Sequence, residues 1–146
     1  MKSRYLLVSP CRNEERFCRR TLDTVVRQSV LPALWVIVDD GSTDGTPAIL
    51  REYAARHPFI RVVRREDRGE RSVGPGVVDA FNAGYATVDA KEFDFVCKLD
   101  LDLEMPERYF ELLMARMAEE PRIGTCSGKA YFRTSNGSLV SEAIAD

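Results

Sequence analysis

The stretch of sequence that decides the fold of this chain reads Val36-Ile37-Val38-Asp39-Asp40-Gly41-Ser42-Thr43-Asp44-Gly45-Thr46. An apolar run that begins at Ala33 ends here in two adjacent carboxylates, and a loop rich in glycine and hydroxyl residues follows. Pro47 then opens a segment whose apolar residues have helical spacing. The pattern predicts a buried strand, a tight loop and the start of a helix. Ligands of open α/β sheets bind at the carboxyl ends of the strands, so we expect these acids to meet a ligand.

A second strand-like run ends in the same way. The apolar segment 93–99 is followed by Asp100-Leu101-Asp102. Alternate residues of an extended segment point in the same direction, so we expect both carboxylates to face one ligand. Two strands that end in acids therefore predict a ligand site at the carboxyl edge of one sheet.

The rest of the chain alternates between strand-like and helix-like segments. Apolar runs predict strands at residues 5–8, 33–38, 59–63, 93–99 and 123–132. Helical spacing predicts helices at residues 14–29, 46–57, 77–88 and 106–120. This order predicts an α/β fold with a mostly parallel sheet and helices on both faces. We expect residues 1–146 to form a single domain with a sizeable core.

The composition excludes several classes of partner. With 21 basic and 23 acidic residues, the formal net charge is -2, which gives no electrostatic case for binding nucleic acid. No apolar run is long enough for a signal-peptide core or a transmembrane span. The cysteines form no CxxC pair, and Cys97 is expected to be a buried thiol. These features favour a reducing, cytoplasmic setting.

The acidic edge suits a hard divalent cation. Mg²⁺ and Mn²⁺ prefer oxygen ligands, and Mg²⁺ is typically held by one or two carboxylates together with substrate phosphates. This arrangement predicts a nucleotide diphosphate as the ligand, with Asp39 accepting hydrogen bonds from a base or ribose. A basic segment follows the third strand and is predicted to close over phosphate oxygens; its arginines include Arg64, Arg65, Arg68 and Arg71.

Each of these signals also has a plainer interpretation. A D-x-D pattern and the 39–46 loop both fit solvated turns, because Asp, Gly, Ser and Thr favour turns. The arginine segment fits a solvated surface, and Asn13 and Thr46 fit helix N-caps. His57, the only histidine, is expected at the surface. Without a second histidine or a CxxC pair, a zinc site is not expected.

Together, the motifs resemble those of glycosyltransferase family 2. The resemblance rests on residues 8–14 (VSPCRNE), 36–46 (VIVDDGSTDGT), 81–84 (FNAG) and 98–102 (KLDLD), whose order and spacing match. It covers nearly the whole chain. It implies a GT-A fold, which is a three-layer α/β/α sandwich with a Rossmann-like nucleotide-binding half. It also implies sugar transfer, usually with inversion, from a nucleotide-diphosphate sugar such as a UDP-sugar to a glycan, lipid or small-molecule acceptor.

The resemblance also implies roles for particular residues. Asp39 would accept from the base, which is uracil in the UDP-sugar enzymes, and Asp102 would coordinate Mg²⁺ or Mn²⁺. Asp100 would lie near the ribose and diphosphate. The full set of implied donor contacts is Pro10, Arg12, Glu14, Asp39, Arg71 and Asp100.

The sequence departs from the family at its acceptor side. Members use a later Asp or Glu as general base, and many carry a Gln-x-x-Arg-Trp motif; neither is found, and the only tryptophan is Trp35. We therefore expect the donor-binding half of a glycosyltransferase without its acceptor half. Two alternatives stay open: a non-catalytic nucleotide-sugar-binding module, and a metal-dependent nucleotidyltransferase. Exposed apolar surface would favour a homo-oligomer, and peripheral membrane association is a further expectation.

Overall fold

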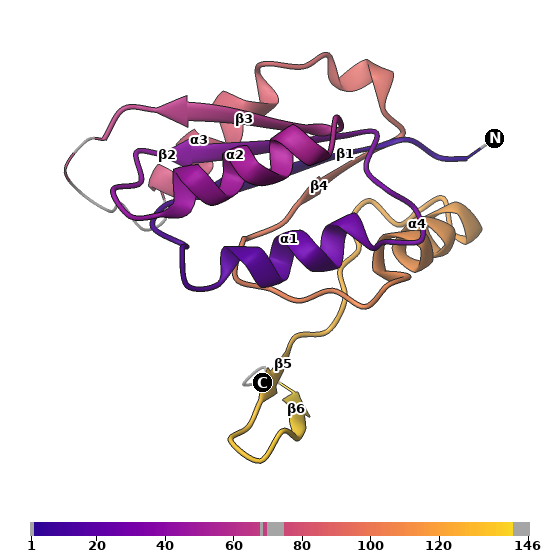
Figure 1. Cartoon of the computed structure of the whole chain (residues 1–146). Coiled ribbons are helices and arrows are strands. Elements are labelled where there is room, and N and C mark those ends of the chain that lie inside the picture. The colour runs from indigo at the N-terminus through magenta and orange to yellow at the C-terminus, as the bar shows by residue number, and fades with distance from the viewer. Residues whose placement is uncertain (1, 68, 70–74, 142–146) are drawn as a thin grey trace. The chain divides into compact units, whose positions relative to one another are not determined.

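The computed structural model describes residues 2–67, 69 and 75–141, and these divide into two compact units (Figure 1). The first unit is Met1–Arg108 and the second is Tyr109–Asp146.

The first unit is built on a parallel sheet of four strands in the order β3-β2-β1-β4. Three helices and a short 3-10 turn connect the strands, as the alternating sequence pattern predicts. The elements are β1 (Tyr5–Cys11), α1 (Cys18–Val26), β2 (Leu34–Asp40), α2 (Thr46–Arg56), β3 (Ile60–Arg65), α3 (Pro75–Tyr85), η1 (Ala90–Glu92) and β4 (Phe95–Lys98). The predicted α/β class with a mostly parallel sheet is confirmed.

Helices cover both faces of this sheet, which makes three layers (Figure 1). One face packs on α3 through a cluster that contains Val8, Val36, Val38 and Ala80. Gly84 permits this close approach, because a Cβ atom there would lie 2.5 Å from Val38 Cγ2. The other face carries the odd-numbered side chains and lies under α1 and α2. Burial on both faces explains why β1 and β2 read as continuous apolar runs.

Strand β1 continues through Pro10, whereas the sequence predicted that Ser9 and Pro10 would end it. Proline lacks an N–H group and is tolerated where no ladder bond is needed. The backbone of Val8 accepts from Leu99 on the β4 side, so Pro10, two residues on, faces that side as well. The pairing of β1 with β4 stops at Val8, and the missing N–H of Pro10 therefore leaves no broken bond.

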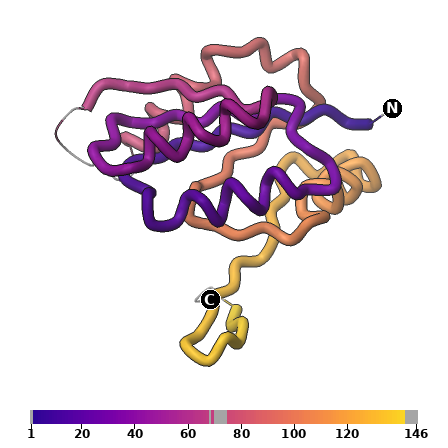
Figure 2. Tube along the Cα trace, in the orientation of Figure 1, coloured from indigo at the N-terminus to yellow at the C-terminus, as the bar shows by residue number. Residues whose placement is uncertain are grey.

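The order in which successive strands are added to the sheet reverses at β1. The chain steps from β1 to β2 and β3 on one side and then crosses to β4 on the other side. The loops after β1 and β2 lie at one end of the sheet, where β3 also ends (Figure 2). In open α/β sheets the ligand crevice lies outside the carboxyl ends of the strands, at such a switch point. The topology therefore points to the space between the ends of β1 and β4.

The second unit contains α4 (Tyr109–Glu119) and an antiparallel pair of short strands, β5 (Tyr131–Arg133) and β6 (Leu139–Ser141). The predicted strand at residues 123–132 was wrong for most of its length, since only its last two residues belong to a strand. Gly124 and Gly128 interrupt that run, and glycine weakens a strand. Helix α4 also begins later than the residue 106 that was predicted.

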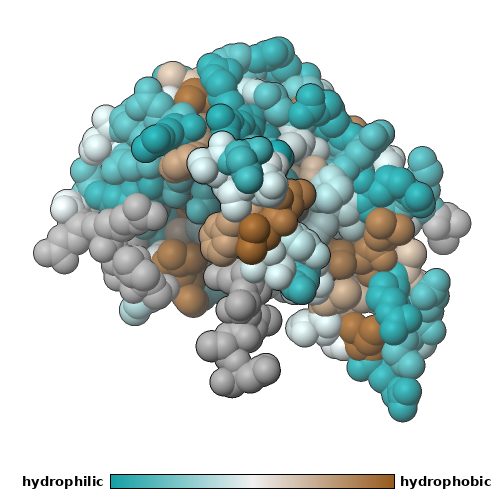
Figure 3. Space-filling model, turned by 90° about the horizontal axis from the view of Figure 1, so that it is seen from below, coloured by the Kyte–Doolittle hydropathy of each residue, from teal (hydrophilic) through white to brown (hydrophobic). Residues whose placement is uncertain are grey.

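Apolar side chains reach the surface in several places, and Figure 3 shows one face where they lie among hydrophilic residues. The strands of the second unit contribute Tyr131, Phe132, Leu139 and Val140 to the exposed set. Cys97 is partly exposed, so the expectation of a buried thiol was wrong. In the described part of the chain, no helix has the length and apolar character needed to span a bilayer.

Candidate functional site

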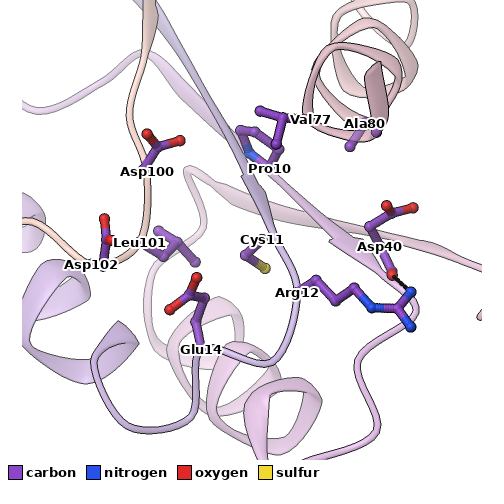
Figure 4. A pocket seen from close by; sticks show the side chains of 11 residues that line it. Pro10, Cys11, Arg12, Glu14, Asp40, Val77, Ala80, Asp100, Leu101 and Asp102 are labelled. Atoms are coloured by element: carbon purple, nitrogen blue, oxygen red, sulfur yellow. Dashed lines mark hydrogen bonds between the residues drawn. The ribbon is translucent and has the colours of Figure 1, made fainter. Parts of the chain in front are cut away.

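A cavity of about 200 Å³ lies in the first unit, at the switch point of the sheet (Figure 4). Its walls come from the ends of β1 and β2, the segment after β4 and the first turns of α3. The lining residues are Pro10, Cys11, Arg12, Glu14, Asp40, Gly76, Val77, Ala80, Asp100, Leu101 and Asp102. The predicted meeting of two acid-terminated strands at one edge is thus seen in the structure.

The pocket has two chemically different ends (Figure 4). At one end, Arg12 reaches toward the end of β2, and its Nη1 donates to the backbone oxygen of Asp40 at 2.9 Å. At the other end, the carboxylates of Asp100 and Asp102 follow β4. Pro10 and Cys11 lie between these ends.

Two loops that shape the pocket are joined by a ladder of hydrogen bonds. The Asn13 N–H donates to Ser42 Oγ at 2.9 Å, and the Thr43 N–H donates to Asn13 Oδ1 at 2.8 Å. The Glu14 N–H donates to Thr46 Oγ1 at 2.9 Å. Asn13 has a φ of 54°, a left-handed conformation that asparagine tolerates better than most residues.

The same contacts correct the expectation that Asn13 and Thr46 are N-caps. Helix α1 begins at Cys18 after Phe17, and no side chain caps it. Helix α2 begins at Thr46 itself, with Gly45 in the N-cap position. Both polar side chains instead connect the loop after β1 to the loop after β2, which fixes the wall of the pocket.

Asp39 lies outside the lining of the pocket and is 1% exposed. Its Oδ2 accepts from Arg64 Nη1 at 2.6 Å, and its Oδ1 accepts from the Ser42 N–H at 2.9 Å. The buried carboxylate therefore has an arginine partner and holds the loop that follows β2. Asp40 lines the pocket in its place, and its Oδ1 lies 3.3 Å from Arg65 Nη1.

The alternation of side chains along β2 explains this difference between the two acids. Val36 and Val38 face α3, and Asp40 continues that series. Asp39 belongs to the other series and faces away from α3. The first turns of α3 supply the pocket residues Gly76, Val77 and Ala80. The parity of residues along β2 could have singled out Asp40 from the sequence, once the face covered by α3 was known.

Asp100 and Asp102 both line the pocket, although they lie beyond the end of β4, with Asp102 in a turn. Lys98 Nζ lies 2.6 Å from Asp100 Oδ1. Asp102 makes no hydrogen bond or ion pair within the described part of the chain. The described residues contain no group of three or more His, Cys, Asp or Glu side chains arranged to hold a metal. Two carboxylates are nevertheless enough for a cation that is shared with phosphate oxygens.

The remaining predicted contacts divide into three groups. Pro10, Arg12 and Glu14 line the pocket. Arg71 lies outside the described residues, and so does Arg68. Arg64 and Arg65 belong to β3 and pair with Asp39 and Asp40.

Local environment shifts the ionisation of two groups near the pocket. Burial, reinforced by the nearby Asp39 carboxylate, raises the pKa of the Cys11 thiol well above its ordinary value. Cys11 is therefore a neutral thiol in the pocket wall at neutral pH. Burial opposes the ionisation of Asp44, but hydrogen bonds from Thr46 and Glu15 outweigh it and lower the pKa of this carboxyl group.

A parallel α/β sheet with a polar crevice at its switch point defines a class of ligand-binding α/β proteins. Comparison with known proteins identifies the family within that class. Residues 7–141 match the family described as Glycosyl transferase family 2. The chain belongs to this family, and the resemblance based on its motifs is confirmed.

Individual relatives support the same assignment. Over 130 residues, 89% of this chain, it is 25% identical to the putative glycosyltransferase EpsH of Bacillus subtilis. The mannosyltransferase PcManGT from Pyrobaculum calidifontis, solved with GDP-Man and Mn²⁺, is 25% identical with a TM-score of 0.65. That match covers 85% of this chain and 34% of PcManGT.

A third similar protein is glucosyl-3-phosphoglycerate synthase from Mycobacterium tuberculosis, solved with Mn²⁺, UDP and phosphoglyceric acid. It is 26% identical with a TM-score of 0.57, over 80% of this chain and 39% of that chain. These neighbours confirm the GT-A fold. The chain spans about a quarter to a third of the length of the curated relatives it matches (24% to 35%).

Proposed function

We propose that this chain binds a nucleotide-diphosphate sugar in the switch-point pocket and serves as the donor-binding part of a glycosyltransferase. One observation carries the proposal: in a family 2 member, a single cavity brings Pro10, Arg12 and Glu14 together with Asp100 and Asp102. The loop after β1 and the acid pair after β4 are separated by most of the first unit in sequence, yet they line the same cavity.

The two ends of the pocket suit the two ends of such a donor. The Arg12 and Asp40 end offers a planar guanidinium and a carboxylate, which suit hydrogen bonding to a nucleoside. We place the diphosphate at the Asp100 and Asp102 end. Asp39, held by Arg64 and Ser42, supports the base end through the loop that it anchors.

The charges of the pocket favour a divalent cation as part of the bound donor. Among the lining residues that the structure describes, Glu14, Asp40, Asp100 and Asp102 carry carboxylates, and Arg12 is the one cationic side chain. A diphosphate would meet strong repulsion in such a pocket unless a cation lay between the acids and the phosphates. The oxygen donors of Asp102 and Asp100 suit Mg²⁺ or Mn²⁺, and the ion would neutralise charge on the leaving diphosphate.

The reaction is proposed as a direct displacement with inversion at the anomeric carbon. The acceptor oxygen bonds to that carbon while the bond to the diphosphate oxygen breaks, and the electron pair leaves with the nucleoside diphosphate. The acceptor proton passes to a general base. The acceptor is a glycan, a lipid or a small molecule.

Amide chemical-shift mapping tests the proposed site. We expect UDP or GDP with Mg²⁺ to shift the amides of residues 11–14, 40, 76–80 and 100–102, while β5 and β6 stay unchanged. ATP with Mg²⁺ is the control for general phosphate binding. Saturable shifts confined to another part of the chain, or no shifts in folded protein, would contradict the proposal.

A further inference from the structure

The side chain of Arg12 is held between the ends of two different strands. Its Nη1 donates to the backbone oxygen of Asp40, at the end of β2. Its Nη2 donates to Asp67 Oδ1 at 2.7 Å, in the segment that follows β3. The Arg12 side chain is 14% exposed, so this guanidinium is largely enclosed although it lines the pocket.

Asp67 is itself fixed by its surroundings. Its Oδ1 accepts from the Gly69 N–H at 2.9 Å. Its backbone lies directly on Gly41, because a Cβ atom at Gly41 would lie 2.5 Å from Asp67 Cα. The Gly69 N–H and the Arg12 guanidinium together hold the pKa of Asp67 below its ordinary value, so this carboxylate is charged at neutral pH.

We propose that Asp67 is a positioning residue of the donor pocket, which acts by holding Arg12 across the end of β2. This inference rests on the proposed function. Two fixed partners leave the guanidinium plane little freedom, and pre-organised groups lose less entropy when a ligand binds. Asp67 is not among the described residues that line the pocket, and it accepts its charge-assisted hydrogen bond from Arg12, which does line the pocket.

Asp89 provides a control for Asp67, because it makes the same turn contact without a bond to Arg12. Asp89 Oδ1 accepts from the Lys91 N–H at 3.0 Å, which is the same contact two residues on that Asp67 makes. Asp89 is also exposed, and it does not line the pocket. Only Asp67 has an additional bond to a pocket arginine.

A double-mutant cycle tests the inference, with the Kd for UDP and for GDP measured in the presence of Mn²⁺. We expect Asp67→Ala to weaken nucleotide binding about five- to tenfold, and Asp89→Ala to leave it unchanged. In an Arg12→Met background, Asp67→Ala should change the Kd by less than about twofold. Asp67→Asn removes the charge but can keep the turn, and it should give an intermediate loss.

The outcomes that overturn the inference are distinct. If Asp67→Ala binds nucleotide with the same Kd as wild type, Arg12 needs no such anchor. Should that variant not fold, the same result for Asp67→Asn would lead to the same conclusion. A loss of equal size with and without Arg12 would show that Asp67 acts through general stability. Wild-type protein that binds neither UDP nor GDP would overturn the proposed function, and this inference with it.

Discussion

Asp102 carries the most specific chemical expectation in the chain. It lines the end of the pocket where the diphosphate is proposed to bind. It makes no polar contact within the described residues, whereas Asp100 pairs with Lys98. This difference makes Asp102 the better candidate for a metal ligand, because its oxygens are not already engaged. The proposed metal site therefore depends more on Asp102 than on Asp100.

Substitution of Asp102 should uncouple nucleotide binding from the metal. We expect Asp102→Asn to weaken Mn²⁺-dependent nucleotide binding by about tenfold or more, because one anionic ligand is lost. Calorimetric titration measures the effect. Glu104→Gln is the control, since Glu104 lies two residues further along and pairs with Arg20 outside the pocket. A Kd for Asp102→Asn that matches wild type would rule out the metal assignment.

The sequence predicted which residues belong to this site better than it predicted how they are arranged. The sequence singled out Pro10, Arg12, Glu14, Asp100 and Asp102 as site residues, and all of them line one cavity. The sequence pointed to Asp39, whereas Asp40 is the acid of this pair that lines the pocket. The sequence could not show this, because which acid faces the pocket depends on the face of the sheet that α3 covers. The partners of Asp39 and Asp40 are Arg64 and Arg65 of a neighbouring strand, and a contact across strands leaves no local pattern.

At the level of elements, Gly41 is where the loops after β2 and β3 meet. It has a φ of 74°, and a Cβ atom there would collide with the backbone of Asp67. Gly69 has a similar φ of 76°, but a Cβ atom at Gly69 would have no heavy atom within 4 Å among the described residues that are not its chain neighbours. Comparing the two glycines therefore separates the cost of a left-handed backbone from the cost of close packing.

Alanine at these two glycines should therefore have different costs. We expect Gly69→Ala to lower the free energy of unfolding by about 1 kcal/mol, from the left-handed conformation alone. Gly41→Ala should lower it by about 3 kcal/mol, since the 66–67 backbone must also move. Urea denaturation measures both values. Equal losses would mean that the contact between Gly41 and Asp67 does not constrain the loops.

The stability that Asp44 gives to the loops after β1 and β2 should depend on pH. Asp44 accepts from the Thr46 and Glu15 N–H groups, and its pKa is lowered in the folded state. A lowered pKa adds stability above the unfolded pKa, and that stability is lost as the pH falls through the folded pKa. We expect Asp44→Asn to cost about 1 kcal/mol at pH 7 and less below about pH 4.

Chemical denaturation across this pH range measures the loss. Asp79→Asn is the control, because Asp79 is exposed on α3 and makes no polar contact in the described residues. A difference between wild type and Asp44→Asn that stays constant from pH 7 to pH 3 would contradict the assigned role of the carboxylate.

For the whole molecule, the sequence predicted the parallel sheet well and the second unit poorly. Buried strands such as β1 and β2 are continuous apolar runs, and their pattern is local. The segment before β5 has apolar residues interrupted by glycines, so its pattern did not separate strand from loop. The strands of the second unit are short and exposed, which gives little periodicity to detect.

The division into two compact units leads to a prediction for a shorter chain. All residues that line the pocket lie within Met1–Arg108. We expect residues 1–108 to fold and to bind nucleotide with a Kd within about threefold of the full chain, because compact units with their own core can fold alone. Circular dichroism and calorimetry check this. An unfolded fragment would show that the first unit needs residues 109–146.

The central claim is that the switch-point pocket binds a nucleotide diphosphate together with a divalent cation. The most direct measurement is a calorimetric titration of the full chain with UDP, with and without Mn²⁺, and with GDP as the comparison nucleotide. We predict saturable binding of one of the two nucleotides that strengthens at least about tenfold when Mn²⁺ is present. Folded protein that binds neither nucleotide under either condition would contradict the claim.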